Sequence, residues 1–388
     1  MKTKLKEVSC FLIIMLILVI GCKREPFQFG NKIGNITYSG KTIFLDAAEL
    51  SVLKDVSAGT LVFSSQPGKI GNIRKDNILA MGVSEKTPYG LLRKVVSIQK
   101  NGSSIEIKTD DATLEDAIIE GTISLNRKLL EKNFSLGTKI DGVLVKGPTK
   151  SFDGLAITMD KVQLYSAGNQ TAWLDGSIGV SPEIKIEIKI ETSQIKSIEI
   201  NTILTKIDEV SVSSNSAFSG KNEVTLANFI HVPIVLDSIV FVPMIKIKGG
   251  FDRSINCQVS AGVRQDRVIT SNLKYENLLW TPAFTSDSPV YDYINPQITT
   301  NSDLKIFSGP EMTILLFGVP IQIVSSNGYY ELKADKTWQD WWKLGIGIDG
   351  TNLVKSDILG LDQDFTYVLN IQPSQIGSAN FPNGSKSK

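Results

Sequence analysis

A nine-residue stretch in the middle of the chain alternates strictly between charged and isoleucine side chains. It covers residues 183–191, so that Ile184, Ile186, Ile188 and Ile190 share one face and the charges share the other. Successive side chains of a β-strand point to opposite faces, so this period of two predicts a strand with one buried and one wet face. Strands of this kind are typical of antiparallel sheets.

Short apolar runs separated by turn residues recur through most of the remaining chain. Their spacing of roughly 8–12 residues is typical of sandwiches and barrels. Asn101-Gly102 predicts a hairpin turn between strands at Leu91–Gln99 and Ser104–Thr109. Residues 111–120 predict a short helix that Gly121 ends. We therefore expect a mostly β protein, with antiparallel sandwich/barrel-like sheets in two domains and one or two short helices.

The first 22 residues have the pattern of an export signal. A basic beginning is followed by the apolar run Phe11–Ile20 and then by Gly21-Cys22. The run is shorter than the roughly 20 residues that span a bilayer. Val19–Cys22 resembles a bacterial lipobox, which implies cleavage before Cys22 and attachment of fatty acyl groups such as palmitate to that cysteine. The alternative is an uncleaved anchor helix in which Cys22 is an ordinary residue.

This resemblance places the protein in the bacterial cell envelope, in contact with a membrane through N-terminal acyl chains. Lys23 follows the cysteine. Enterobacterial lipoproteins with Asp at that position stay in the inner membrane, so the outer membrane is favoured here. The resulting division of the chain is a signal peptide (1–21), a lipidated tether (22–40), a small β module (41–150), a larger antiparallel β domain (151–371) and a disordered tail (372–388).

Several further segments resemble uncharacterised bacterial exported β-rich proteins. In the first half these are Gly82–Val95, which contains Thr-Pro-Tyr-Gly-Leu-Leu-Arg-Lys-Val, and Thr109–Ile118, which contains Ala-Thr-Leu-Glu-Asp-Ala-Ile. In the second half they are Phe241–Met244, Trp280–Pro282, Gly309-Pro310 and Trp341-Trp342. The resemblance covers most of the mature chain and implies an exported β architecture. It carries no activity and no site residues with it.

Composition and motifs give little support to a catalytic role or to nucleic-acid binding. The formal net charge of +1 provides no large basic field for nucleic acid. The chain has one histidine, His231, and no nucleophile elbow, phosphate-binding loop or Cys-x-x-Cys motif. We assign no catalytic residue, metal ligand or cofactor. Cys257 remains alone once Cys22 is lipidated, so we expect it to be a small buried residue without a disulfide.

The candidate ligand-binding residues are Trp338, Trp341 and Trp342. Exposed tryptophans stack on sugar rings or lie at membrane interfaces, whereas buried ones hold a loop against a sheet. Two groups of aspartates are further candidates. Asp335, Asp340 and Asp349 would suit a glycosidase, and Asp357, Asp362 and Asp364 would form either a calcium site or a solvated loop.

Three classes of function are compatible with these features. The first is a lipid-anchored surface protein with an interaction, structural or binding role and no chemistry. The second is a binder of lipid or another apolar ligand in an internal cavity, because Ile239–Ile245 is apolar on both faces. The third is a carbohydrate binder or hydrolase that uses the tryptophans and scattered carboxylates.

Overall fold

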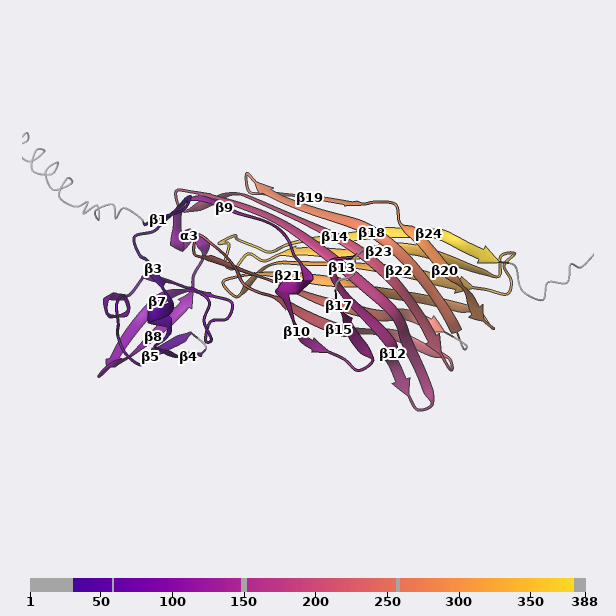
Figure 1. The fold of residues 1–388 in the computed structure, drawn as a ribbon. Helices are drawn as coiled ribbons and strands as arrows, with labels where there is room; N and C mark the ends of the chain where they lie inside the picture. The colour runs from indigo at the N-terminus through magenta and orange to yellow at the C-terminus, as the bar shows by residue number, and fades with distance from the viewer. Residues whose placement is uncertain (1–30, 58, 148–151, 256–258, 380–388) are drawn as a thin grey trace, which may run out of the picture.

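The computed structural model describes residues 31–57, 59–147, 152–255 and 259–379, and these residues form three β-sheets (Figure 1). Two long sheets lie face to face as a sandwich, and a smaller sheet lies at one end of it. The described chain begins at Asn31 beside the small sheet. It ends at Ala379, at the opposite end of the sandwich. We call these the near end and the far end.

The first sheet of the sandwich has ten strands, in the order β1-β2-β9-β13-β14-β18-β19, with β11 and β12 continuing beside β13 and β20 beside β18. Their bounds are β1 Lys32–Ile33, β2 Ile36–Tyr38, β9 Ile118–Lys128, β11 Val143–Lys146, β12 Leu155–Ala167, β13 Gln170–Glu191, β14 Gln194–Ser214, β18 Val259–Glu276, β19 Leu279–Ser286 and β20 Val290–Ile298.

The second sheet of the sandwich has eight strands, in the order β10-β15-β17-β21-β22-β23-β24, with β16 beside β17. Their bounds are β10 Phe134–Lys139, β15 Phe218–His231, β16 Ile234–Leu236, β17 Ile239–Ile255, β21 Ser302–Leu316, β22 Val319–Ala334, β23 Trp342–Val354 and β24 Phe365–Ala379. All the pairings in both long sheets are antiparallel.

The small sheet has six strands in the order β3-β6-β7-β8-β5-β4. Their bounds are β3 Thr42–Leu45, β4 Leu53–Ser57, β5 Thr60–Phe63, β6 Ile78–Met81, β7 Leu91–Asn101 and β8 Ser104–Asp111. The helical turns are α2 Ala47–Leu50, α3 Leu114–Ala117, η1 Ile70–Asn72 and η2 Glu131–Asn133. The prediction of a mostly β fold with short helices is confirmed.

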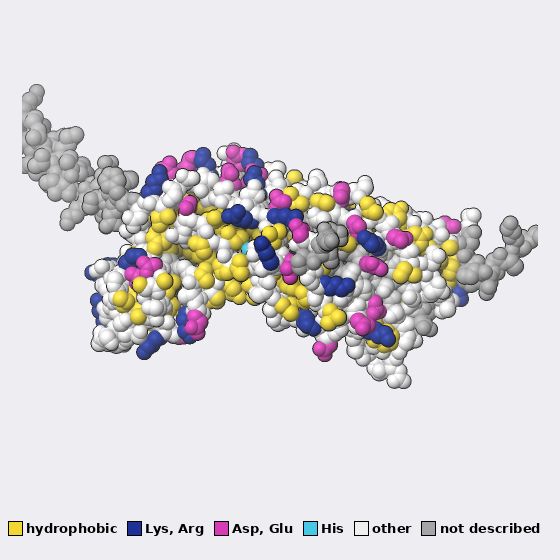
Figure 2. All heavy atoms as spheres, in the orientation of Figure 1, with side chains coloured by type: hydrophobic (Ala, Val, Ile, Leu, Met, Phe, Trp, Pro, Cys, Tyr) yellow, Lys and Arg dark blue, Asp and Glu magenta, His cyan; other side chains and the backbone are white. Residues whose placement is uncertain are grey.

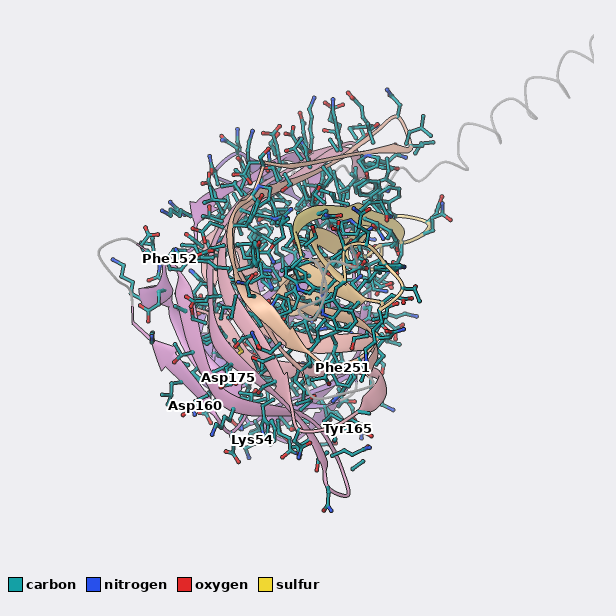
Figure 3. All side chains as sticks on the ribbon, turned by 90° about the vertical axis from the view of Figure 1, so that its right-hand side faces the viewer. Lys54, Phe152, Asp160, Tyr165, Asp175 and Phe251 are labelled. Carbon is teal, nitrogen blue, oxygen red and sulfur yellow. The ribbon has the colours of Figure 1, made fainter. Side chains whose placement is uncertain are left out.

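The space between the two long sheets is the main hydrophobic core. Ile184, Ile186, Ile188 and Ile190 all face it, as the alternation predicts. Aromatic contacts join the two sheets near their edges: the rings of Tyr165 (β12) and Phe251 (β17) lie 6.2 Å apart at the far end (Figure 3). Trp280 (β19) stacks on Phe365 (β24) at 5.2 Å. The sandwich is therefore held together along both sides.

The small module and the sandwich share part of one core. Within β6, Leu79 and Met81 face the core of the module, whereas Ile78 and Ala80 belong to the core of the sandwich. Gly90 lies against Val240 of β17, and a Cβ at this glycine would be 3.0 Å from the valine. These contacts dock the module against the near end of the sandwich.

The two sequence segments of the first-half resemblance form this junction. Gly90 belongs to the Thr-Pro-Tyr-Gly stretch, and α3 lies in the Ala-Thr-Leu segment, where Thr113 and Asp116 make a capping box. At the start of α3, the backbone N–H of Leu114 donates to the carbonyl of Ile358 (2.8 Å). The side chain of Glu115 accepts a hydrogen bond from the N–H of Ile195 (2.7 Å).

The structure draws the domain boundaries differently from the sequence. The small sheet ends at Asp111, and β9, β10 and β11 belong to the sandwich although they precede residue 150. β1 and β2 pair within the region expected to be a tether, and β24 continues to Ala379, through the start of the expected tail. The predicted helix over 111–120 is shortened to α3, because Ile118 already pairs with Tyr38 as the start of β9. Cys22 and Cys257 lie outside the described residues.

Candidate functional site

A polar layer crosses the hydrophobic core, and it begins with a change of pattern along β14. Ile198 and Ile200 face the interior, but farther along the same strand the apolar residues Ile203 and Ile207 occupy the outer positions. The pairing of β14 with β18 continues without a register shift. A strand cannot turn over without a bulge, so the inner positions are filled by Lys206 and Asp208.

Lys206 links the two sheets. It is 2% exposed, forms an ion pair with Asp208, and donates a 2.5 Å hydrogen bond to the carbonyl oxygen of Ser308 on β21. Arg267 lies directly opposite it on β18 and adds a second buried cation. Burial raises the pKa of Asp208 to about 6 and lowers the pKa of Lys206, and each effect is opposed by the partner's charge.

A neutral chain of hydrogen bonds extends the polar layer. Thr202 donates to Gln322 across the core (3.3 Å), Gln322 donates to Asn352 (3.0 Å), and Asn352 donates back across the core to Ser271 (2.7 Å). Two of these four buried side chains come from each sheet. Because their partners must face one another, these bonds favour one alignment of the sheets.

The polar layer has perturbed pKa values but no exposed reactive group. Its two charged members on β14 are at most 2% exposed, so bulk substrate does not reach them. Among the described residues, no group of three or more His, Cys, Asp or Glu side chains could hold a metal ion. What this arrangement does is fix how the sheets pack. The strict alternation of residues 183–191 does not predict the polar layer. The move of isoleucine to the outer positions, which begins at Ile203, is nevertheless visible in the sequence.

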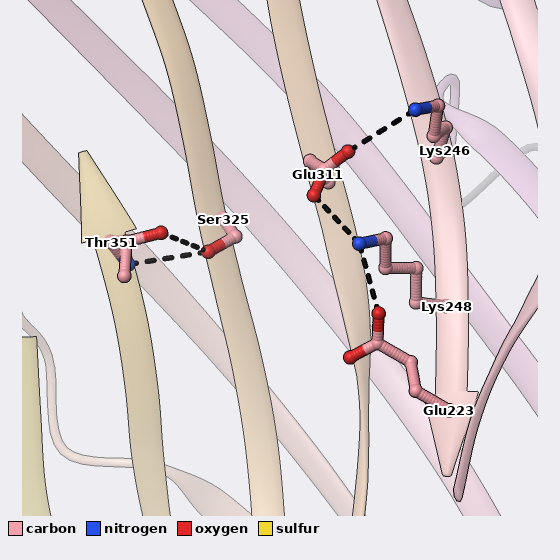
Figure 4. A network of polar contacts seen from close by, with 6 residues as sticks. All are labelled: Glu223, Lys246, Lys248, Glu311, Ser325 and Thr351. Carbon is pink, nitrogen blue, oxygen red and sulfur yellow. Dashed lines mark hydrogen bonds and ion pairs between the residues drawn. The ribbon is translucent and has the colours of Figure 1, made fainter. Parts of the chain in front are cut away.

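A second polar network lies on the outer face of the eight-stranded sheet (Figure 4). Lys248 contacts Glu311 at 2.7 Å and Glu223 at 3.0 Å, and Lys246 reaches Glu311 at 3.5 Å. Burial lowers the pKa of Lys248, but hydrogen bonds to the two glutamates outweigh it, so the net shift is upward. Ser325 and Thr351 share a 2.7 Å hydrogen bond on neighbouring strands. These are cross-strand pairs that stabilise the sheet.

The three candidate tryptophans do not form a common binding surface. Trp341 and Trp342 are 2% and 6% exposed and belong to the core, and the ring of Trp342 lies edge-on to Tyr293 at 6.4 Å. Trp338 is exposed, with the ammonium of Lys343 5.1 Å from its ring centre. Two of the three residues therefore hold the loop before β23 against the sandwich, and one faces solvent.

The acidic candidates are engaged in separate local contacts. Asp364 pairs with Lys355 (2.5 Å) and accepts hydrogen bonds from Ser356, and the Lys355 contact is the main reason that its pKa falls to about 2. Asp335 accepts from Thr337, and Asp349 pairs with Lys305. Asp357, Asp362 and Asp364 do not form a metal-binding group in the described part of the chain.

An exposed apolar surface lies beside the histidine side chain on the face shown in Figure 2, between the module and the sandwich. Leu136, Val232 and Val235, which we call the edge patch, are 44%, 53% and 55% exposed. Leu136 and Val235 lie on β10 and β16, which each pair with one strand among the described residues. His231 itself is buried with its ring 4.9 Å from Phe134, and burial lowers its pKa.

A hollow of about 270 Å³ continues the edge patch toward the other sheet. Val235 and Leu236 line one side, and Thr122 and Ser124 of β9 line the other. Over residues 121–128, β9 pairs with β13 alone among the described strands. Apolar side chains beside unpaired strand edges are typical of protein-binding surfaces.

The apolar run Ile239–Ile245 lies between packed layers. Residues 239–243 and Ile245 are buried, Val240 contacts Gly90 of the module, and neighbouring side chains belong to the sandwich core. The two apolar faces of this run thus have protein on both sides.

The chain matches no protein-family model, no curated protein and no solved structure. None of the helices among the described residues is both long and apolar enough to cross a membrane.

Proposed function

We propose that this protein is a lipid-anchored component of the bacterial cell envelope, without enzymatic activity, whose sandwich is a rigid arm that extends from the membrane and whose interaction surface lies at the near end of that arm, beside the module. The anchor is Cys22, and the outer membrane is the favoured location. The basic start, the apolar run and the Gly21-Cys22 pair of the sequence support this location.

The observation that carries the proposal is the direction of the sandwich relative to the start of the chain. The described chain begins at the near end, and the 22 residues of β13 span the sandwich from the far end to the near end, a length of roughly 70 Å. The module and the sandwich share core residues at the junction, so the body does not depend on a flexible linker between them. A long body that the chain enters at one end suits a rigid arm that extends from the membrane.

The interaction role is supported by the edge patch. Leu136, Val232 and Val235 expose apolar surface beside strand edges that have no partner within the described ranges, where a partner protein could pair with the backbone and cover the side chains. We assign a protein partner with an extended segment to this surface.

The anchoring claim is tested by Cys22→Ser in cells. The thiol is the acceptor of the acyl group, so the variant should remain an unprocessed precursor and lose acyl labelling. Lys23→Ala serves as the matched control and should be processed like the wild type. Normal processing and labelling of Cys22→Ser would refute the lipid anchor.

A further inference from the structure

The turn between β18 and β19 exposes two neighbouring leucines. Leu278 is 83% exposed, the highest value for a large hydrophobic side chain in the described part of the chain, and Leu279 is 70% exposed. Glu276 pairs with Leu279, so Asn277 and Leu278 alone form the turn. An apolar pair at a hairpin tip is costly in water and suits an apolar partner.

The backbone of this turn is unfavourable for leucine. Asn277 and Leu278 have φ values of 53° and 64°, in the left-handed region where Asn and Gly are tolerated and a bulky side chain is strained. The other two-residue turns with two positive φ values place Ser193, Ser238 and Gly318 at the second position. A leucine at position 278 is therefore disfavoured both by its backbone conformation and by its exposure to water. Neither Leu278 nor Leu279 contributes to the folded core.

Aromatic packing fixes the base of the hairpin. The ring of Trp280 lies 5.1 Å from Tyr275 and stacks on Phe365 of the opposite sheet at 5.2 Å. The two leucines thus project from a supported strand end rather than from a long loop.

The leucines lie at the near end, where the chain enters. Ser197 of β14 pairs with Glu276 of β18. The turn between β13 and β14 at Thr192-Ser193 and the turn between β18 and β19 at Leu278 therefore lie at the same end of the sheet. Asn31 leads directly into β1, and from β1 to β19 the sheet order gives six strand spacings, or roughly 29 Å. Cys22 precedes Asn31 by nine residues, which reach at most about 30 Å. A membrane that holds Cys22 is within reach of the leucines.

We propose that Leu278 and Leu279 enter the apolar region of the same bilayer that holds the acyl chains of Cys22, as a second point of attachment. This inference rests on the proposed lipid anchor. Apolar side chains that enter the boundary between headgroups and acyl chains add their buried area to the attachment that the acyl chains provide. Neighbouring charges are paired, with Lys274 at 2.8 Å from Glu276 and Lys189 at 2.8 Å from Glu191. The contact should therefore not require anionic lipid.

The test uses the lipidated full-length mature protein on phosphatidylcholine vesicles. In a Cys257→Ser background, Leu278→Cys carries an environment-sensitive dye, and Asn169→Cys at the far end is the matched control. On vesicles the dye at position 278 should shift to the blue and be quenched by nitroxide-labelled lipid, and the dye at position 169 should remain in water. The shift should persist at high salt.

The outcomes separate the two proposals. If the protein sediments with vesicles but the dye at position 278 stays in water, the leucine contact is refuted and the anchor stands. If the protein does not sediment with vesicles, the anchor fails first. A blue shift that depends on protein concentration without vesicles would assign the leucines to contact between copies and overturn the inference. As a second variant, Leu278→Asp/Leu279→Asp should lower vesicle partitioning at least tenfold and Leu144→Asp, at another exposed site, should not; equal losses would also refute it.

Discussion

Gly328 on β22 leaves the space that the ammonium group of Lys206 occupies from the opposite sheet. A Cβ at this glycine would lie 2.8 Å from Lys206 Nζ and 2.6 Å from Gln265 Nε2. The missing side chain on one sheet and the buried cation on the other are therefore complementary. The polar layer depends on a glycine that no turn or positive φ requires.

Gly328→Ala should destabilise the protein by about 1–3 kcal/mol, because the methyl group overpacks a region where Lys206 has little room to move. The free energy of unfolding in denaturant measures this. Gly82→Ala is the control, since a Cβ there meets nothing within 4 Å. An equal effect of both substitutions would mean that the close contact has no energetic consequence.

The Lys206–Asp208 pair should give stability a distinctive dependence on pH. The pKa of Asp208 is raised from 3.8 to about 6 by burial. Between these values the folded state binds the proton more tightly, so stability falls as pH rises from about 4 to 6, by an amount on the order of 3 kcal/mol for this group. Above pH 6 its contribution is constant. Denaturant unfolding at several pH values measures the slope.

The matched variant is Lys206→Met/Asp208→Leu, which replaces both charges by apolar groups and should lack this slope. Asp364→Asn is the control: its pKa is lowered to about 2, so its contribution is lost at lower pH and the slope between pH 4 and 6 should remain. The same slope in the double variant would show that Asp208 does not titrate in this window.

Substitutions on the two faces of β13 should change the stability by very different amounts. Ile186 is fully buried and pairs with Ile200 and Leu125, so Ile186→Asp should cost several kcal/mol. Glu187 is exposed and lies opposite Glu199, so Glu187→Gln should change stability by less than about 0.5 kcal/mol. Comparable losses from both would contradict the alternation of buried and wet faces.

The local sequence pattern was sufficient to predict structure where a single preference determined the outcome. The isoleucines of residues 184–190 predict their own burial because the charges between them can only be solvated on the other face. The hairpin near Asn101 was also predictable, although the turn residues are Gly102 and Ser103, since Asn101 pairs with Ser104 as the end of β7. A shift of one residue is beyond what turn preference alone decides.

Long-range pairing was not predictable in the same way. β9, β10 and β11 are close in sequence to the small module, yet their partners β13, β15 and β12 lie later in the chain. The inward charges Lys206 and Asp208 contradict local hydrophobic preference, which would bury Ile203 and Ile207. The register that β14 keeps with β18 decides their direction, and this depends on residues some 60 positions away.

The edge patch should be covered by a protein in the cell. A photoreactive amino acid at position 235, in place of Val235, should give a discrete cross-linked adduct in intact cells. The same group at position 368, in place of the similarly exposed Val368 on β24, should not. Adduct formation should fall when Leu136 and Val232 are both replaced by Ser. Adducts that form equally at positions 235 and 368 would contradict a dedicated surface.

The most direct test of the central claim measures how far each end of β13 stands from the membrane. In the lipidated protein with Cys257→Ser, single cysteines replace Gln194 at the near end and Asn169 at the far end, and each carries a donor dye on vesicles that contain an acceptor lipid. Energy transfer should be strong from position 194 and weak from position 169, because the strand between them is roughly 70 Å long. Equal transfer from both positions would mean that the sandwich lies flat on the membrane and would contradict its role as an arm.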